Sequence, residues 1–99
     1  MLDQQKFNEI KDLMGDGFGD FVKLFLSELR KDIDTIMDTE DVSVIKLKAH
    51  SQKSSCGLIG VSELSGVFLE IEELANQSKR SQTLIDKLPE LFLQLEREL

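Results

Sequence analysis

Residues 18–38, FGDFVKLFLSELRKDIDTIMD, decide the fold class of this 99-residue chain. Apolar side chains recur in this stretch every three or four residues, which is the period of an amphipathic helix. The stripe consists of Phe18, Phe21, Val22, Phe25, Leu29, Ile33, Ile36 and Met37. Asp16 precedes it with the side chain of a helix N-cap, and the pattern ends near Thr39. The sequence therefore predicts one long helix here, with one face buried in a helical core.

The same period continues on both sides of this stretch. Further helices are expected over about residues 7–14, from a cap at Asp41 to about Gly60, from a cap at Ser62 onward, and from about Ser81 to the end. Pro89 removes a backbone hydrogen bond in the last helix and predicts a kink or a restart. The apolar stripe stays in phase across it, which favours a kink. Because the connections are short, residues 1–99 are expected to form one all-α domain, an antiparallel up-down four-helix bundle with a short extra N-terminal helix.

Composition limits the class of protein. A single cysteine cannot form an internal disulfide, which is typical of a reducing compartment. No secretory signal is recognisable, and no apolar stretch approaches the roughly 20 residues that cross a bilayer. A cytoplasmic monomer is therefore expected. The net charge of −7 disfavours nucleic acid and anionic membranes as partners.

Positive charge is concentrated in one window of this acidic chain. Residues 42–62 contain no Asp or Glu, whereas Lys46, Lys48 and Lys53 all lie within them. The only histidine of the chain, His50, lies there as well. The window is thus the one region suited to an acidic partner.

His50 should point away from the bundle. Its own helical face carries Lys46, Lys53, Ser54 and Gly57, whereas the opposite side carries the seam Ile45, Ala49, Gln52, Cys56 and Ile59. Gln52 is a polar exception in the seam, and Lys48 lies close enough to it to require an extended side chain. The small Ser54 and Gly57 are expected to leave room beside the imidazole.

These neighbours suit a histidine that carries a phosphoryl group. The unperturbed pKa of an imidazole is about 6.5, so at neutral pH most of it is the free-base nucleophile. Lys53 can supply a cation for the phosphoryl oxygens, and Ser54 can supply a hydroxyl donor. In-line geometry and Mg²⁺ can come from a partner, so neither a cofactor nor a metal is expected on this chain.

Residues 49–60, AHSQKSSCGLIG, resemble the signature of histidine-containing phosphotransfer (HPt) domains. In that signature the phosphoacceptor histidine follows an alanine and precedes a lysine, a small residue and a glycine. The matching positions here are Ala49, His50, Lys53, Ser54 and Gly60. The stretch 18–38 and Pro89 are similar to that family too. Two positions depart from it, because the family commonly has leucine at Gln52 and often has glycine at Ser54.

The resemblance implies a phosphoryl carrier rather than a kinase, with His50 as phosphoacceptor and Lys53 and Ser54 beside the phosphoryl group. The implied partners are receiver domains of a hybrid sensor histidine kinase, of a response regulator, or of both. Each would bring acidic residues and Mg²⁺ around its aspartate, which the positive window would meet. Docking is expected on the exposed face of the third helix and on part of the second. The expected docking residues are Lys46, Gly57 and Gly60.

Other interpretations of His50 stay open at this point. A helical adaptor would bind a receiver or kinase through the same face without carrying phosphate. A small hydrolase would use Ser54 as nucleophile and His50 as base, although no third member or oxyanion donor is evident. A zinc site of His50 and Cys56 is disfavoured, because six residues along a helix place them on nearly opposite sides. The sequence contains no glycine-rich phosphate loop, so it does not indicate ATP binding.

Overall fold

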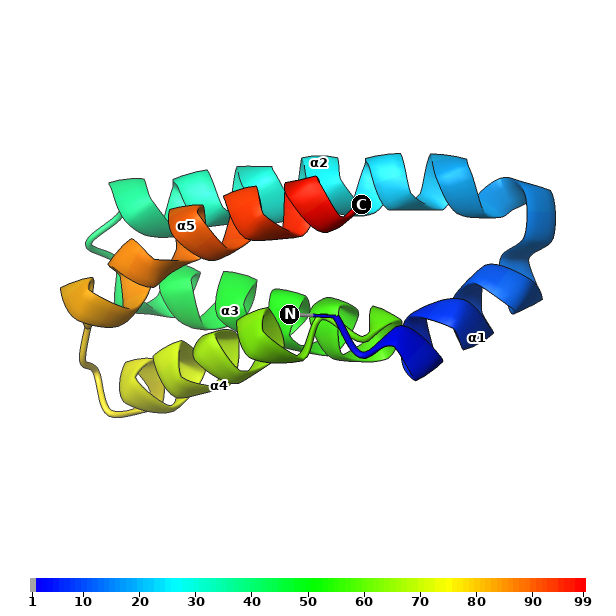
Figure 1. Ribbon diagram of the computed structural model, residues 1–99. Helices are drawn as coiled ribbons and strands as arrows, with labels where there is room; N and C mark the ends of the chain where they lie inside the picture. Colours follow the sequence, from blue (N-terminus) through cyan, green and yellow to red (C-terminus); the bar gives the residue numbers. More distant parts are fainter. Residues whose placement is uncertain (1) are drawn as a thin grey trace.

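The computed structural model describes residues 2–99 and shows an elongated helical bundle of 41 × 20 × 19 Å. Its elements are α1 (Gln4–Met14), the 3₁₀ turn η1 (Gly15–Gly17), α2 (Phe18–Asp38), α3 (Val42–Ile59), α4 (Ser62–Asn76) and α5 (Gln82–Glu98). Short connections reverse the chain between successive long helices (Figure 1). The predicted all-α bundle with a short N-terminal helix is confirmed.

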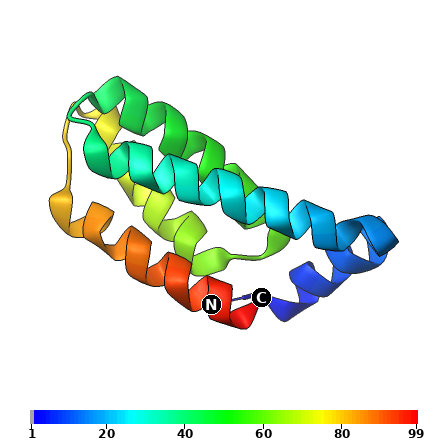
Figure 2. The ribbon, with the colours of Figure 1, turned by 90° about the horizontal axis from the view of Figure 1, so that it is seen from above.

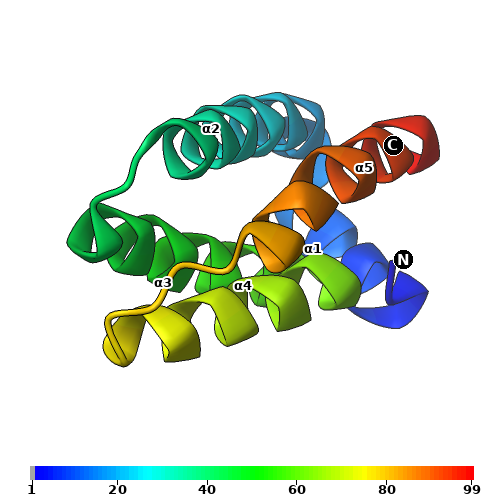
Figure 3. The ribbon, with the colours of Figure 1, turned by 90° about the vertical axis from the view of Figure 1, so that its left-hand side faces the viewer.

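The long helices form a closed ring around one core. Each of them contacts two neighbours, in the order α2, α3, α4, α5 and back to α2, with the most extensive pairing between α3 and α4. Figure 2 shows the length of the bundle from above, and Figure 3 shows the four helices nearly end-on, with α3 diagonally opposite α5. No helix in residues 2–99 is long and apolar enough to span a membrane.

The apolar stripes found in the sequence supply this core. Its fully buried large side chains include Leu29, Ile36, Ile45, Ile59, Leu64, Phe68, Ile85, Leu88 and Leu95. Along α2 the stripe is buried at Phe18, Phe25, Leu29, Ile33 and Ile36, whereas Met37 remains exposed at its end. The last helix continues through Pro89 without interruption, so the alternative of a restart there is wrong.

The helix cap predicted at Asp41 is confirmed, and Ser81, at the expected start of the last helix, also acts as a cap. The Asp41 side chain accepts a hydrogen bond from the backbone N–H of Ser43 and begins α3, and Ser81 accepts one from the N–H of Leu84 and begins α5. In each case the side chain satisfies a backbone donor that has no partner within the first turn of the helix.

The two remaining predicted caps, Asp16 and Ser62, are wrong. Asp16 lies inside the 3₁₀ turn, and α2 begins after Gly17 without a side-chain cap. Ser62 is already the first residue of α4, with Val61 in the cap position. Both junctions are shaped by packing instead, since Phe18 and Val61 are buried there.

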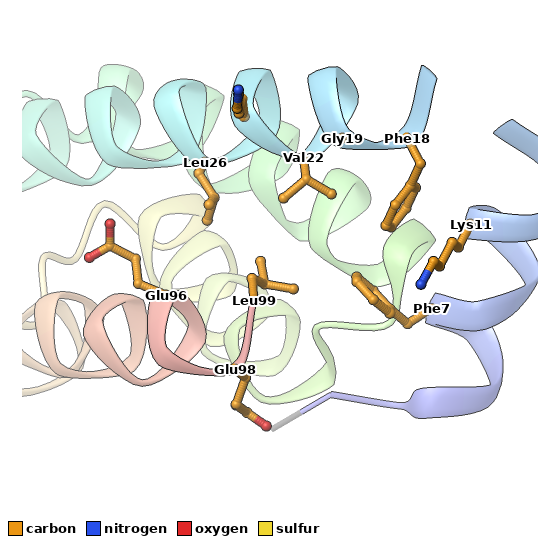
Figure 4. A pocket seen from close by; sticks show the side chains of 10 residues that line it. Phe7, Lys11, Phe18, Gly19, Val22, Leu26, Glu96, Glu98 and Leu99 are labelled. Carbon is orange, nitrogen blue, oxygen red and sulfur yellow. The ribbon is translucent and has the colours of Figure 1, made fainter. Parts of the chain in front are cut away.

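The N-terminal segment covers one end of the bundle. The backbone N–H of Asp3 donates to the carbonyl of Gly60 at 2.7 Å, and Leu2 and Val61 form an isolated antiparallel bridge. Farther along, the rings of Phe7 and Phe18 meet edge to face, with their centroids 5.1 Å apart. A hollow of about 480 Å³ remains where α1, the start of α2 and the end of α5 converge (Figure 4).

Candidate functional site

His50 lies on the outer face of α3 with 62 % of its side-chain surface exposed. The preceding residue, Ala49, is fully buried, so the helix turns its apolar side inward at this position. The prediction that the imidazole points out of the bundle is confirmed. Cys56 is also fully buried, so its thiol does not converge with the ring on a shared metal site.

A carboxylate from the neighbouring helix joins two of the predicted site residues. Glu72 on α4 places its Oε2 atom 2.6 Å from His50 Nδ1 and its Oε1 atom 2.6 Å from Lys53 Nζ. Only 11 % of the Glu72 side chain is exposed, compared with 28 % for Lys53. The imidazole and the ammonium are therefore held beside one another by a single, largely buried group.

The pairing with Glu72 determines which ring nitrogen is free. An ionised carboxylate can only accept hydrogen bonds, so the neutral imidazole donates its proton from Nδ1. Nε2 then keeps its lone pair and is the nucleophilic atom. The same contacts lower the pKa of Glu72 from its ordinary value of 4.5, chiefly through the hydrogen bond from Lys53 and also through that from His50, while burial opposes them.

Lys53 and Ser54 lie beside the histidine, as their spacing predicts, but their polar atoms are engaged within the protein. The Lys53 ammonium reaches the ring through the shared carboxylate of Glu72. The Ser54 hydroxyl donates to the backbone carbonyl of His50 at 3.3 Å. It does not bond to the imidazole, as a serine nucleophile activated by a histidine base would require.

A second polar cluster explains the two irregular residues of the α3 seam. Gln52 is buried, and its Nε2 donates to Asp32 Oδ2 at 2.8 Å. Lys48 extends to the other oxygen of the same carboxylate, with its Nζ 3.6 Å from Oδ1. Asp32 on α2 thus tethers α3 on the side away from His50. The Oε1 atom of Gln52 remains buried without a partner in residues 2–99.

The structure corrects the role expected of Gly60. It is buried, not a docking residue, and it ends α3 with a φ of +91°. A Cβ added there would lie 2.8 Å from the Asp3 carbonyl and 3.1 Å from Lys6 Cβ. Glycine is required because the backbone is left-handed and the N-terminal segment lies directly against it.

Gly57 also serves a different purpose from the one expected. A Cβ added at Gly57 would lie 3.3 Å from Ser65 Oγ, on α4. Its missing side chain therefore permits the close approach of α3 and α4, whereas the sequence suggested room beside the imidazole. The Ser65 hydroxyl, which donates to the Lys53 carbonyl at 2.9 Å, occupies this contact.

Lys46, the remaining predicted docking residue, is exposed beside the histidine. It lines a shallow hollow of about 500 Å³ together with Ser43, Leu47, His50 and Glu72. Within residues 2–99, no carboxylate oxygen lies within 4.0 Å of its ammonium.

An apolar surface lies on the α2 side of His50. Leu58 on α3 and Leu24 on α2 are 65 % and 62 % exposed. They flank a groove of about 190 Å³ between the two helices, with Phe21 and Phe25 among its other lining residues. Leu47, also 65 % exposed, lies one turn before His50. Three leucines are thus exposed along the α2 side of the helix that carries His50.

Glu72 and Asp32 are the polar residues around the candidate site that sequence reasoning missed. Each follows its apolar stripe at core spacing, Asp32 three residues after Leu29 and Glu72 four residues after Phe68. An acidic residue at such a position requires a cationic or donor partner. The sequence therefore indicated that each carboxylate needs a partner, but not which one, because the partners lie on another helix.

Comparison with known proteins adds one match. A family model described as "Hpt domain" matches residues 20–98, which is most of the chain. No curated protein and no solved structure matches this chain.

Proposed function

This chain belongs to the Hpt domain family, which acts in histidine phosphotransfer within two-component signalling, and we propose that His50 is its phosphoacceptor. The observation that carries the proposal is the exposed imidazole whose Nδ1 atom is held by Glu72. A phosphoacceptor needs one accessible nitrogen with a free lone pair, and this arrangement provides it at Nε2.

In the proposed step, His50 Nε2 attacks the phosphorus of an aspartyl phosphate on a receiver domain. The new N–P bond forms as the P–O bond to the aspartate breaks, and the carboxylate leaves with the electron pair. The ring proton stays on Nδ1, so the imidazole becomes cationic beside Glu72, which stabilises it. The reverse reaction passes the phosphoryl group to a second receiver.

Lys53 and Ser54 support this chemistry in different ways. The Lys53 ammonium balances the charge of Glu72, so the phosphoryl group does not meet an uncompensated carboxylate. Ser54 keeps a small side chain beside the ring, with its hydroxyl 3.3 Å from the His50 carbonyl oxygen. A modest rotation of that hydroxyl would let it donate to a phosphoryl oxygen instead.

The partners proposed are the receiver domains of a hybrid sensor histidine kinase and of a response regulator, between whose aspartates this chain, as a cytoplasmic monomer, relays the group. They would bring Mg²⁺ and would dock on α3 and α2, where Leu24, Leu47 and Leu58 are exposed. The acid-free window around His50 favours the acidic surroundings of a receiver aspartate. No kinase activity of its own is proposed.

The test is phosphorylation of the purified protein by a phosphorylated receiver domain, compared with His50→Gln. The wild type should acquire acid-labile label and pass it to a second receiver, whereas the variant should acquire none. Label of equal amount in the variant would refute His50 as acceptor. Receiver binding that survives His50→Ala, together with normal signalling in cells, would instead favour the adaptor function.

A further inference from the structure

A phosphoryl group on His50 would need a cation that the contacts around the ring do not yet supply. A phosphoryl group on a ring nitrogen brings close to two negative charges and several acceptor oxygens to the site. The ammonium of Lys53 is already engaged by Glu72 at 2.6 Å. These two groups neutralise each other, so the added charge still needs a cation.

Most other donors near the ring are engaged as well. The Ser43 hydroxyl donates to Asp41 Oδ1 at 2.6 Å, and Lys48 pairs with Asp32 on the α2 side. Lys6 reaches the carbonyl of Gly57, two turns of α3 beyond His50. None of these groups is both free and next to the imidazole.

Lys46 meets both conditions. It lies four residues before His50, a spacing that places two Cβ atoms about 5–6 Å apart on one helix face. Helical side chains tilt toward the N-terminus, so the imidazole leans over the turn that carries Lys46. Both residues line the same hollow of about 500 Å³, and within residues 2–99 no carboxylate lies within 4.0 Å of the Lys46 ammonium.

We propose that this hollow receives the phosphoryl group and that Lys46 is the residue that binds its oxygens, while Lys53 holds Glu72. The inference rests on the proposed function of His50 and assigns the charge-compensating role to the lysine one turn before the acceptor. Leu47 forms the apolar side of the hollow, which reduces the water around the new ion pair and strengthens it.

Phosphoramidate, a small donor that needs no protein partner, separates phosphoryl binding from docking. His50 Nε2 attacks its phosphorus, the N–P bond to the imidazole forms, and ammonia leaves with the electron pair of the broken P–N bond. The rate of phosphohistidine formation, followed by ³¹P NMR, is compared among wild type, Lys46→Ala, Lys46→Arg, Lys53→Ala and Lys87→Ala. Lys87 is an exposed control on α5, diagonally opposite α3 (Figure 3).

Lys46→Ala should lower the rate about tenfold, the loss expected for one charge-assisted hydrogen bond. Lys46→Arg should retain most of it, and Lys87→Ala should match wild type. The slowing of the reaction by added salt should be weaker in Lys46→Ala than in wild type, a readout that a purely structural role would not change.

Equal rates in Lys46→Ala and Lys87→Ala would overturn the inference and leave His50 as acceptor intact. A loss in Lys53→Ala without one in Lys46→Ala would overturn it as well, by assigning the phosphoryl contact to Lys53. A wild-type protein that acquires no phosphoryl group on His50 would remove the proposed function and this inference together.

Discussion

The Nδ1 atom of His50 lies 2.6 Å from the Oε2 atom of Glu72, although 22 residues separate them in the sequence. The contact crosses from α3 to α4, the two helices that pack most extensively. It makes the proposed chemistry of an exposed side chain depend on a largely buried one.

Glu72→Gln should change the tautomer of His50. Without an anionic acceptor at Nδ1, the neutral ring populates both tautomers, and the fraction with a free Nε2 falls. Imidazole ¹⁵N chemical shifts should therefore show Nδ1–H in the wild type and a mixture in the variant. Phosphorylation by phosphoramidate should slow about tenfold, the cost of losing one charge-assisted hydrogen bond. Unchanged ¹⁵N shifts would contradict the positioning role.

Stability should depend on pH through Glu72. Its pKa is lowered in the folded protein, chiefly by the hydrogen bond from Lys53, so its contribution is complete above its ordinary pKa of 4.5. That contribution is lost as the pH falls through the lowered value, where the folded carboxylate takes up its proton. In urea titrations, wild type should exceed Glu72→Gln in free energy of unfolding at pH 7, with the gap narrowing below pH 4.5. A gap independent of pH would contradict this assignment.

Gly60→Ala should destabilise the fold. A left-handed backbone costs an alanine about 1–2 kcal/mol, and the 2.8 Å approach to the Asp3 carbonyl adds strain to that cost. Gly66→Ala is the matched control, because Gly66 lies within α4 with open space around it and should gain about 0.5–1 kcal/mol. Thermal unfolding should shift in opposite directions for the two variants. A neutral Gly60→Ala would show that the turn adapts.

Leu58→Ser should weaken receiver binding without affecting direct phosphorylation. Leu58 is 65 % exposed beside the groove between α2 and α3, and loss of an apolar contact of this size at an interface raises Kd about tenfold. Leu93→Ser on α5, where Leu93 is 52 % exposed, should leave both measurements unchanged. Isothermal titration with a receiver domain and ³¹P NMR with phosphoramidate separate the effects. Equal losses in both variants would argue against the α2–α3 face.

Cys56 should be inert in the native protein. Burial raises the pKa of its thiol to about 12, so almost none is the reactive thiolate at pH 8. Iodoacetamide should modify it only after unfolding in guanidinium, which mass spectrometry can follow. Rapid alkylation of the folded chain would show that α3 opens readily.

Local patterns predicted most of this fold. Asp41 acts on a donor two residues away, so its capping role could be predicted from the sequence. Ser81, at the expected start of the last helix, acts on a donor three residues away. Asp16 and Ser62 have suitable side chains, but the packing of Phe18 and Val61 set the beginnings of α2 and α4. Such packing depends on neighbours that are distant in sequence.

The candidate site was likewise predictable only where its features arise within one helix. The exposure of His50 and the position of Lys53 follow from helical spacing within α3 alone. The role of Glu72 depends on the register of α4 against α3, which no single-helix pattern contains. Gly60 combines a local and a distant effect. Its left-handed conformation suits a helix end, but its burial depends on Asp3, near the beginning of the sequence.

The stretch shared with the family begins at residue 20, whereas the hydrogen bond between Asp3 and Gly60 and the contact of Phe7 with Phe18 lie partly or wholly before it. The folded structure of this protein therefore extends beyond the stretch that matches the family model. A version trimmed to the shared stretch would uncover the turn between α3 and α4, and fraying there would spread first to the helix that presents the imidazole.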